Sequence, residues 1–375
     1  MRILSVSLGL PKDDAAHQRM HDISRLLKEN GHEVDSVHYY RTPEHLSFDS
    51  DLRNHEFVRT SIFNIYLRHL TILKKKKYDL VYGNRLTSSF CAQMSRILDI
   101  PIIYDRHGDA VQELFIENNN QLKKLREIYS LAKYWLIDEV DIRLCNCILC
   151  VSKNMIENLA DRGVPLQKMH YVTNGVDLSL FRPVELTSKT AHLKSDLGID
   201  GKFVFGYLGS TERWQGVTNL VEAARRLNDK RSAVLIVGGQ NDKKMNENIV
   251  MVKRVPRTSI IDYYSICDVL ILPRPKHPAT TVAAPTKFSE YTAMGKPIIS
   301  TDVGDASELI RKYNCGIVIN DNSVNELVDG MSKALTISES DLRRMGCNSR
   351  ELAEKEFDWD IIGKQLSRII DSICI

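Results

Sequence analysis

Short apolar runs alternate with amphipathic segments along most of the 375-residue chain. The first apolar run, 3–8, is followed by a helical pattern that begins near Asp14 and ends at Asn30 and Gly31, before a second apolar run at 33–39. Glycine after asparagine commonly ends a helix, because it accepts a left-handed backbone conformation. This order predicts a βαβ unit, the building block of a parallel sheet.

The same alternation continues through the first half of the chain and then restarts. Further strand-like runs are expected at 80–82, 102–104, 147–151 and 169–172. After a polar stretch at 177–201, a second series is expected, with strands at 203–207, 233–237, 269–272, 298–300 and 316–319 and helices at 219–227, 259–266, 286–294 and 306–312. The pattern predicts an α/β protein of two Rossmann-like, doubly wound parallel-sheet domains, 1–180 and 181–357, facing each other across a cleft.

Composition excludes several other classes of protein. The net charge of +3 is small for this length, so we expect no nucleic-acid partner. We expect a soluble, cytoplasmic protein, because the first residues resemble a strand rather than a signal peptide and no apolar run approaches about 18 residues. The eight cysteines are then expected to be free thiols. Cys145, Cys147 and Cys150 fit small core residues, with a zinc site as the alternative.

The segment 285–297 carries the strongest chemical signal. Thr286 falls at the start of a predicted helix, where unpaired backbone N–H groups favour an anion, and Lys287 adds a positive charge. Glu290 follows one turn later and can accept hydrogen bonds from both hydroxyls of a ribose. These residues predict a nucleotide phosphate site, although a capped helix with a solvated lysine and glutamate explains the same pattern.

A second segment, 205–216, has the order strand, glycine-bearing loop, helix. Gly209 lies where the backbone could approach a diphosphate closely. In the same domain as Thr286, this loop would form the second wall of one site.

Together these segments resemble the GT-B-type glycosyltransferases of family 4 over nearly the whole chain. The similar segments are 104–108, 150–152, 172–177, 209–216, 255–257, 267–269 and 286–297. The resemblance implies a last helix, 358–375, that crosses back to pack on the first domain. It implies a sugar transferred from a nucleotide diphosphate donor to an acceptor hydroxyl, with retention and without a bound metal or other cofactor.

The resemblance also assigns the site residue by residue. Glu290 would hold the donor ribose, the region of Val255 would meet the base, and Lys287 and Arg213 would meet the phosphates. His107 would lie beside the transferred sugar. The catalytic residues would then be His107, Lys287 and Arg213; the donor-binding residues Gly209, Ser210, Arg213, Val255, Thr286, Lys287 and Glu290; and the acceptor-side residues Gly9 and Asp109.

Three departures from the family pattern concern the donor site. Val282 stands eight residues before Glu290, where many members have glutamate. Ser210 and Gln215 stand where many members have arginine and lysine in the glycine loop. Four cations, Arg213, Arg274, Lys276 and Lys287, could replace the missing charges. The subgroup with a Pro-x-Lys-x-x-Glu-Tyr pattern looks closest.

The functional hypothesis is a glycosyltransferase of surface polysaccharide, glycolipid or glycoconjugate synthesis, acting on a sugar, lipid-linked or small-molecule acceptor. A sugar-nucleotide epimerase of the same fold and a catalytically silent nucleotide-sugar-binding protein are the alternatives. The Asp-x-Asp strings at 49–51 and 358–360 are read as chance, and His17 and His21 as a solvated helix face.

The stretch 53–77 combines seven basic residues with one glutamate and several apolar residues. A basic helix with apolar surface can lie on the inner membrane face, which would suit a lipid-linked acceptor. A buried helix with a solvated lysine end explains the stretch equally well.

Overall fold

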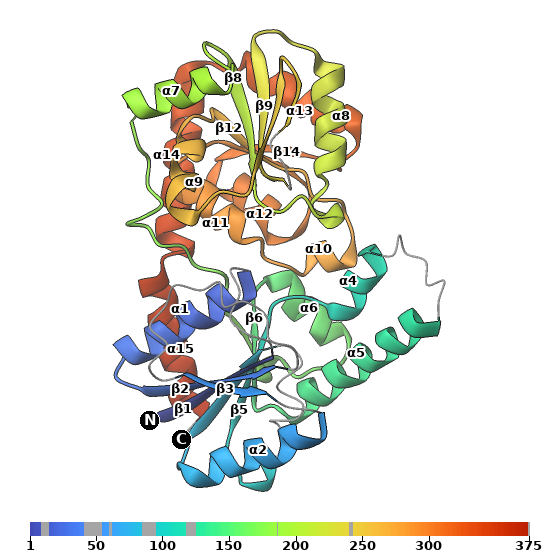
Figure 1. Cartoon of the computed structure of the whole chain (residues 1–375), viewed down its shortest axis with the longest axis vertical. Coiled ribbons are helices and arrows are strands. Elements are labelled where there is room, and N and C mark those ends of the chain that lie inside the picture. The colour runs from blue at the N-terminus through green and yellow to red at the C-terminus, as the bar shows by residue number, and fades with distance from the viewer. Residues whose placement is uncertain are drawn as a thin grey trace. The chain divides into compact units, whose positions relative to one another are not determined.

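A computed structural model of the chain describes residues 1–8, 15–40, 55–59, 62–84, 95–117, 125–185, 187–239 and 243–373 (Figure 1). The chain forms two compact units. The first comprises Met1–Thr173 and Trp359–Ile375, and the second comprises Asn174–Asp358. The chain therefore enters the second unit seven residues before the boundary that the sequence suggested.

The first unit is built on a seven-stranded sheet whose described strand pairs are all parallel. Its strand order is β3-β2-β1-β4-β5-β6-β7. The strands are β1 (Arg2–Leu8), β2 (Glu33–Tyr40), β3 (His55–Arg59), β4 (Leu80–Asn84), β5 (Ile102–Arg106), β6 (Cys147–Cys150) and β7 (Met169–Tyr171). The helices are α1 (Ala15–Glu29), α2 (Ile62–Lys75), α4 (Ala110–Glu117), α5 (Leu125–Leu144), α6 (Lys153–Asp161) and α15 (Trp359–Ile373).

Helices α1 and α15 pack together on this sheet. Apolar residues of α1 at helical spacing, including Ile23 and Leu27, join residues of α15 such as Ile362 and Leu366 in one core with the strands. The helices approach closely at Gly363, where an added Cβ would lie 3.0 Å from Leu26 Cδ2. The C-terminal helix thus completes the core of the first unit.

The stretch 53–77 is not one helix, so that part of the prediction is wrong. His55–Arg59 forms β3, which pairs in parallel with β2 at the edge of the sheet. Phe57 and Val58 favour a strand because aromatic and β-branched side chains suit the pleated surface. Helix α2 begins only at Ile62.

The second unit has its own seven-stranded sheet, with the order β10-β11-β9-β8-β12-β13-β14. Only the edge pair β10 and β11 is antiparallel among the described strand pairs of this sheet. The strands are β8 (Phe203–Leu208), β9 (Ser232–Gly239), β10 (Lys243–Asn246), β11 (Ile249–Lys253), β12 (Val269–Leu272), β13 (Ile298–Thr301) and β14 (Gly316–Ile319). The helices are α7 (Ser188–Asp196), α8 (Val217–Leu227), α9 (Arg257–Ser265), α10 (Pro278–Thr281), α11 (Thr286–Ala293), α12 (Gly304–Tyr313), α13 (Val324–Thr336) and α14 (Glu339–Glu356).

Two parallel-sheet units confirm the predicted fold class, and the predicted strands of the second series are all present. Helices α7, α10, α13 and α14 and the edge strands β10 and β11 were not predicted. Helix α13 is amphipathic and begins at a Ser323 cap, so its pattern was available in the sequence.

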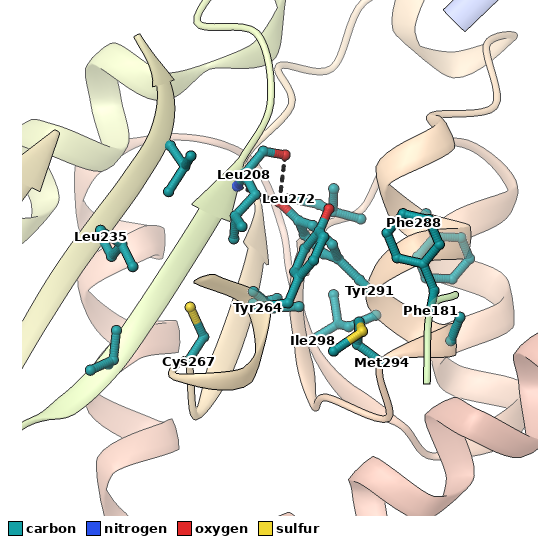
Figure 2. Packing of buried hydrophobic residues seen from close by; sticks show 14 of the residues in the cluster. Phe181, Leu208, Leu235, Tyr264, Cys267, Leu272, Phe288, Tyr291, Met294 and Ile298 are labelled. Carbon is teal, nitrogen blue, oxygen red and sulfur yellow. Dashed lines mark hydrogen bonds between the residues drawn. The ribbon is translucent and has the colours of Figure 1, made fainter. Parts of the chain in front are cut away.

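One contact in the second core aligns α11 with the end of β8 (Figure 2). The buried Tyr291 hydroxyl accepts a hydrogen bond from the backbone N of Leu208 at 3.0 Å and donates to its carbonyl oxygen at 3.4 Å. The Tyr291 ring also packs edge-on against Tyr264 of α9, with 5.6 Å between ring centroids. Helix α11 is thereby held against the strand that leads into the glycine loop.

Candidate active site

The end of β8 lies directly against α11. Gly209 follows β8 with φ of +144°, and an added Cβ there would lie 1.7 Å from Lys287 Cε. The carbonyl oxygen of Gly209 would in turn lie 2.2 Å from a Cβ added at Gly238. Gly238 must lack a side chain because it packs on the backbone of Gly209, and the positive φ of Gly209 would strain any other residue. The lysine predicted to meet a phosphate therefore lies over the loop predicted to approach one.

Lys287 is in a place that disfavours its charge. It is the second residue of α11, and its Nζ lies 5.3 Å from the ring centroid of Tyr207. Burial lowers the pKa of Lys287 to about 7; the positive charge of Arg274 adds to this shift, and Glu290 opposes it.

Arg274 is the second cation of this site. It follows β12 by two residues and is only 4% exposed. Its guanidinium carbon lies 5.3 Å from the ring centroid of Trp214, and Nη1 makes long hydrogen bonds to the carbonyl oxygens of Thr280 and Ala283 at 3.4 and 3.5 Å. Of the four cations considered in the sequence, the structure brings Arg274 and Lys287 together.

Glu290 lies one turn beyond Lys287 and is held by α9. The hydroxyl of Tyr264 donates to Glu290 Oε2 at 2.7 Å, and Arg257 Nη2 lies 3.8 Å from Oε1. The carboxylate side chain keeps 19% of its surface exposed. A fixed, partly exposed carboxylate beside two cations suits the recognition of hydroxyl groups next to a phosphate.

The other predicted donor residues are distributed around these three. Thr286 begins α11 behind Pro285, and Val255 is partly buried against the core. Ser210 accepts a hydrogen bond from Tyr207 through its carbonyl oxygen. Arg213 is exposed in the short helix Arg213–Gln215, whereas its neighbour Trp214 stacks on Arg274.

Two departures from the family pattern are buried. Val282, at the end of α10, is 4% exposed, and so is Gln215, which precedes α8. An apolar side chain at 282 therefore packs in the interior.

In the first unit, three side chains converge on Asp105 at the end of β5. The buried carboxylate accepts from Arg19 of α1 through Nε at 3.0 Å and Nη2 at 2.9 Å, and from the hydroxyl of Tyr82. His107 Nε2 lies 2.8 Å from Asp105 Oδ2. Arg19 also donates to the carbonyl oxygens of Val172 and Thr173. One carboxylate thus joins α1, β4 and β5, with Arg19 reaching the chain after β7.

This network sets both a charge and an orientation. Burial alone would raise the pKa of Asp105, but Arg19 and His107 hold it well below its usual value. Burial and Asp105 raise the pKa of Tyr82 well above its usual value, so the phenol remains a donor. Because His107 Nε2 faces a permanent carboxylate, the neutral ring carries its proton there and keeps Nδ1 as an acceptor.

Asp109 has a structural task beside this network. Its Oδ1 accepts from the backbone N of Val111 at 3.0 Å and of Gln112 at 3.1 Å, which caps α4. Its other oxygen lies 3.4 Å from Nη2 of the buried Arg106. Gly9, the other residue predicted on the acceptor side, lies outside the described residues, as does the Asp-x-Asp string at 49–51.

Sequence reasoning missed Arg19. The two histidines of the same turn, His17 and His21, drew attention instead. The signal was nevertheless present: Arg19 lies four residues before Ile23, on the apolar side of the helix pattern. A charged residue at a core position of an amphipathic helix indicates a buried partner.

The cysteine segment belongs to the core. Cys145, Cys147 and Cys150 are buried free thiols, and burial raises the pKa of Cys145 and Cys150 to about 12. Within the described ranges, no three histidine, cysteine or carboxylate side chains are grouped as metal ligands. None of the helices described here is long and apolar enough to cross a membrane.

The fold matches solved GT-B glycosyltransferases over nearly its full length. The Anabaena protein HepE, solved in complex with UDP, aligns with a TM-score of 0.77 and 17% identity, covering 99% of this chain and 100% of that one. Sucrose-phosphate synthase from Thermosynechococcus elongatus aligns with a TM-score of 0.76 and 17% identity, covering 99% and 98%. The class of the fold is therefore GT-B.

Sequence comparison then gives the family. Residues 16–180 match the model described as Glycosyltransferase Family 4, and residues 189–352 match Glycosyl transferases group 1. An uncharacterized glycosyltransferase of Methanocaldococcus jannaschii is 21% identical over 90% of this chain and 89% of its own length. The chain belongs to the family 4, group 1 glycosyltransferases, which confirms the resemblance.

The Asp105 network predicts a large effect on stability. Arg19→Met should lower the free energy of unfolding by about 3–5 kcal/mol at pH 7, because it leaves a buried carboxylate without its main counter-charge. Arg25→Met, which removes an exposed pair with Glu29 on the same helix, should change it by at most about 0.5 kcal/mol. Urea unfolding of the three proteins measures both.

The pH dependence of this effect has a definite sign. Folding lowers the pKa of Asp105. The ionised carboxylate therefore stabilises the folded protein fully above about pH 4, the pKa of aspartate in the unfolded chain, and this stabilisation is lost as pH falls. The difference in free energy of unfolding between the native chain and Arg19→Met should therefore become smaller below about pH 4. If Arg19→Met and Arg25→Met lowered the free energy of unfolding equally, the assignment of Arg19 and Asp105 as a stabilising buried ion pair would be wrong.

Proposed function

We propose that this protein transfers a sugar from a nucleotide diphosphate donor to an acceptor hydroxyl, with retention, in the synthesis of a surface polysaccharide, glycolipid or other glycoconjugate. The observation that carries the proposal is the contact of Lys287 with the Gly209 loop, beside Arg274. Gly209 leaves the loop backbone open to a ligand, and together with the two cations it would form a site for a diphosphate.

The charge balance of the site supports this ligand. Lys287 and Arg274 repel each other, as the lowered pKa of Lys287 reflects, and Glu290 compensates only in part. A diphosphate would supply the missing negative charge and would relieve that repulsion. The similar protein HepE has been solved with UDP and with UDP-glucose, which favours a nucleotide-sugar ligand here as well.

The remaining donor contacts follow from the geometry around Glu290. The Tyr264 hydroxyl uses Oε2, so the exposed part of the carboxylate would accept the two ribose hydroxyls. Val255, at the entry to α9, would lie toward the base. In the transfer step, Lys287 and Arg274 would stabilise the negative charge that develops on the leaving diphosphate. We propose that this replaces a divalent cation.

His107 is the proposed catalytic residue of the first unit. Its hydrogen bond to Asp105 fixes the ring. Its acceptor atom Nδ1 would then accept a hydrogen bond from a hydroxyl of the transferred sugar. We propose that Asp109 takes part indirectly, because its oxygens already hold α4 and Arg106.

The stretch 53–77 and the location of the enzyme stay predictions. From Leu67 onward, where side chains are described, the exposed residues of α2 are mostly basic: Arg68, Lys74 and Lys75, with Lys76 and Lys77 after the helix. Such a surface suits the anionic inner face of a membrane. We propose a cytoplasmic enzyme that reaches a lipid-linked acceptor there.

One experiment separates transfer from the two alternatives. The protein is incubated with a panel of nucleotide sugars, and both the release of nucleoside diphosphate and the interconversion of the sugar are followed. Release that depends on an added acceptor supports a transferase. Interconversion without release would indicate an epimerase, and binding without either change a silent binding protein.

Glu290→Gln should weaken nucleoside diphosphate binding by about 1.5–3 kcal/mol, because a charge-assisted hydrogen bond to the ribose is lost. Isothermal titration calorimetry measures the change. Glu222→Gln on α8, which removes an exposed carboxylate of the same unit, is the matched control and should leave affinity unchanged. Unaltered affinity in folded Glu290→Gln would remove the ribose assignment.

Donor affinity should fall as pH rises above about 7. The free protein holds Lys287 with a pKa of about 7, and a bound diphosphate favours the protonated form, so binding above that pH requires a proton. The loss should approach about tenfold per pH unit. Titration with an intact nucleotide sugar measures it, because its diphosphate gains no proton in this range.

The control for this slope is Lys276→Met, which removes an exposed lysine near the same site. It should keep both the affinity and the pH dependence, whereas Lys287→Met should bind more weakly and lose the slope. A slope that persists in Lys287→Met would show that another group takes up the proton.

His107→Ala should lower kcat by about 10²–10⁴-fold and change donor affinity little. Turnover, donor binding and thermal melting are measured on one preparation. His170→Ala, a part-buried histidine of β7, is the control and should keep kcat. A lower melting temperature with kcat intact would instead assign His107 a purely structural role.

A further inference from the structure

Helix α10 lies in the loop that follows Arg274, and a histidine caps it. His277 precedes the helix in an extended conformation, and its Nδ1 accepts a hydrogen bond from the backbone N of Ala279 at 3.1 Å. In return, the backbone N of His277 donates to the hydroxyl of Thr280 at 3.1 Å. Helix caps are normally serine, threonine, aspartate or asparagine, whose oxygens accept hydrogen bonds throughout the neutral pH range. An imidazole nitrogen accepts only while the ring is neutral, so this cap depends on pH.

The turn that His277 caps also holds the side chain of Arg274. The carbonyl oxygens of Thr280 and Ala283 accept long hydrogen bonds from Arg274 Nη1, at 3.4 and 3.5 Å. We call these two carbonyl groups the Arg274 cradle. Thr280 is 1% exposed, and its hydroxyl lies 2.6 Å from the carbonyl oxygen of Pro275 and 2.8 Å from that of His277. The cap and the cradle therefore belong to one hydrogen-bonded turn.

Other contacts fix the backbone on either side of this turn. An added Cβ at Gly304, the first residue of α12, would lie 2.7 Å from the carbonyl oxygen of Thr281, so α10 packs directly on the start of α12 (Figure 1). The hydroxyl of Thr301 donates to the backbone carbonyl oxygen of Arg274 at 2.7 Å. These groups do not titrate near neutral pH, whereas the histidine cap does.

We propose that protonation of His277 removes the cap and loosens the Arg274 cradle, which makes α10 a pH-sensitive element of the donor site. The imidazolium ion donates from both ring nitrogens, so its Nδ1–H would face the N–H of Ala279. The turn would lose its capping hydrogen bond and would place two donors against each other. The guanidinium group of Arg274 would then be held less firmly. The effect on donor binding rests on the proposed function, but the effect on Arg274 does not.

The acidic side of neutrality is where this element should respond. Burial lowers the pKa of His277, so the cap is present at pH 7 and is lost at a pH below about 6.5, the usual value for histidine. The unfolded chain takes up this proton first, so the cap's contribution to stability decreases as pH falls below about 6.5. This range is distinct from the range above about pH 7 in which Lys287 loses its proton.

The charged neighbours of α10 do not change their charge in this range. In the described segments around α10 they are Arg274 and Lys276 of the same loop, and Asp302, Asp305 and Arg311 of the β13 end and α12. Arg311 donates to Asp302 at 2.9 Å, and this hydrogen bond lowers the pKa of Asp302. Aspartate in general titrates near pH 4, and arginine and lysine titrate above pH 10. A response between about pH 7 and 5 would therefore belong to the histidine.

The first test follows Arg274 without any ligand. Trp214 stacks on Arg274, so the ¹⁹F resonance of Trp214 in protein labelled with 5-fluorotryptophan reports on the guanidinium group, and Trp214→Phe assigns that resonance. It should shift between about pH 7 and 5 in the native chain and stay constant in His277→Asn, whose amide oxygen caps a helix at either pH. His192→Asn changes an exposed histidine of α7 in the same unit and should behave like the native chain.

Thermal melting checks the cap itself. At pH 7 His277→Ala should melt at a lower temperature than His277→Asn, because alanine cannot accept the hydrogen bond. As pH falls from 7 to 5, the native chain should lose stability relative to His277→Asn. Equal melting of His277→Ala and His277→Asn would show that residue 277 does not cap the helix and would overturn the inference.

The second test measures binding of an intact nucleotide sugar by calorimetry, with UDP-glucose or the member of the nucleotide-sugar panel that binds best. Affinity of the native chain should fall about threefold or more between pH 7 and 5, whereas His277→Asn should keep its affinity. His277→Ala should bind at pH 7 about as weakly as the native chain does at pH 5.

The remaining outcomes are decisive in the same way. Parallel pH profiles of the native chain and His277→Asn would overturn the inference. A Trp214 resonance that titrates through His277 without any change in nucleotide-sugar affinity would also overturn it, since the cradle would then not govern the donor site. If the native chain binds no nucleotide sugar at any pH, the proposed function fails, while the Trp214 resonance still decides whether His277 controls Arg274.

Discussion

The parallel direction of the strands is the constraint on which both candidate sites depend. In a parallel sheet all carboxyl ends lie along one edge, so residues far apart in sequence meet there. In the first unit, Asp105 lies near the carboxyl end of β5, and His107 follows directly after the strand. In the second, Gly209 follows β8 and Arg274 follows β12, and these strands are neighbours in the sheet. The chemistry of each unit is thus concentrated at one edge of its sheet.

The charged side chains at the carboxyl ends of the two sheets are compensated to different extents. Asp105 is buried but fully compensated, since Arg19, Tyr82 and His107 all contact it, and the result is a rigid, permanently ionised anchor. Lys287 and Arg274 are two cations near Glu290, and Arg274 lowers the pKa of Lys287 whereas Glu290 opposes that shift. A buried charge whose partners compensate it stabilises the fold. Two neighbouring like charges repel each other instead, and a ligand of opposite charge would relieve that repulsion.

Charge compensation also extends to the carboxylates of helix α5. Arg106 and Arg162 draw the carboxylates of α5 toward the unit, which leaves its other side apolar and positive. Arg106 is itself part of β5, next to Asp105. The same strand end therefore orders the histidine of the candidate site and sorts the charges of the neighbouring helix.

Much of the fold was determined by local sequence. The alternation of apolar runs and amphipathic segments indicated the strands of both sheets, and Asn30 with Gly31 indicated the end of α1, because both signals act over a few residues. The segment 285–297 indicated an anion site for the same reason: Thr286, Lys287 and Glu290 lie on one helical turn.

Only the tertiary structure decided which distant residues share a site. It paired Arg19 with Asp105, 86 positions apart, and it placed Arg274, rather than Arg213, where its charge lowers the pKa of Lys287. It also showed that α5 exposes several large apolar side chains, because exposure depends on what packs against a helix and not on its composition. Spacing along the chain determines local structure, but burial and charge compensation arise from contacts between segments that the sequence does not order in space.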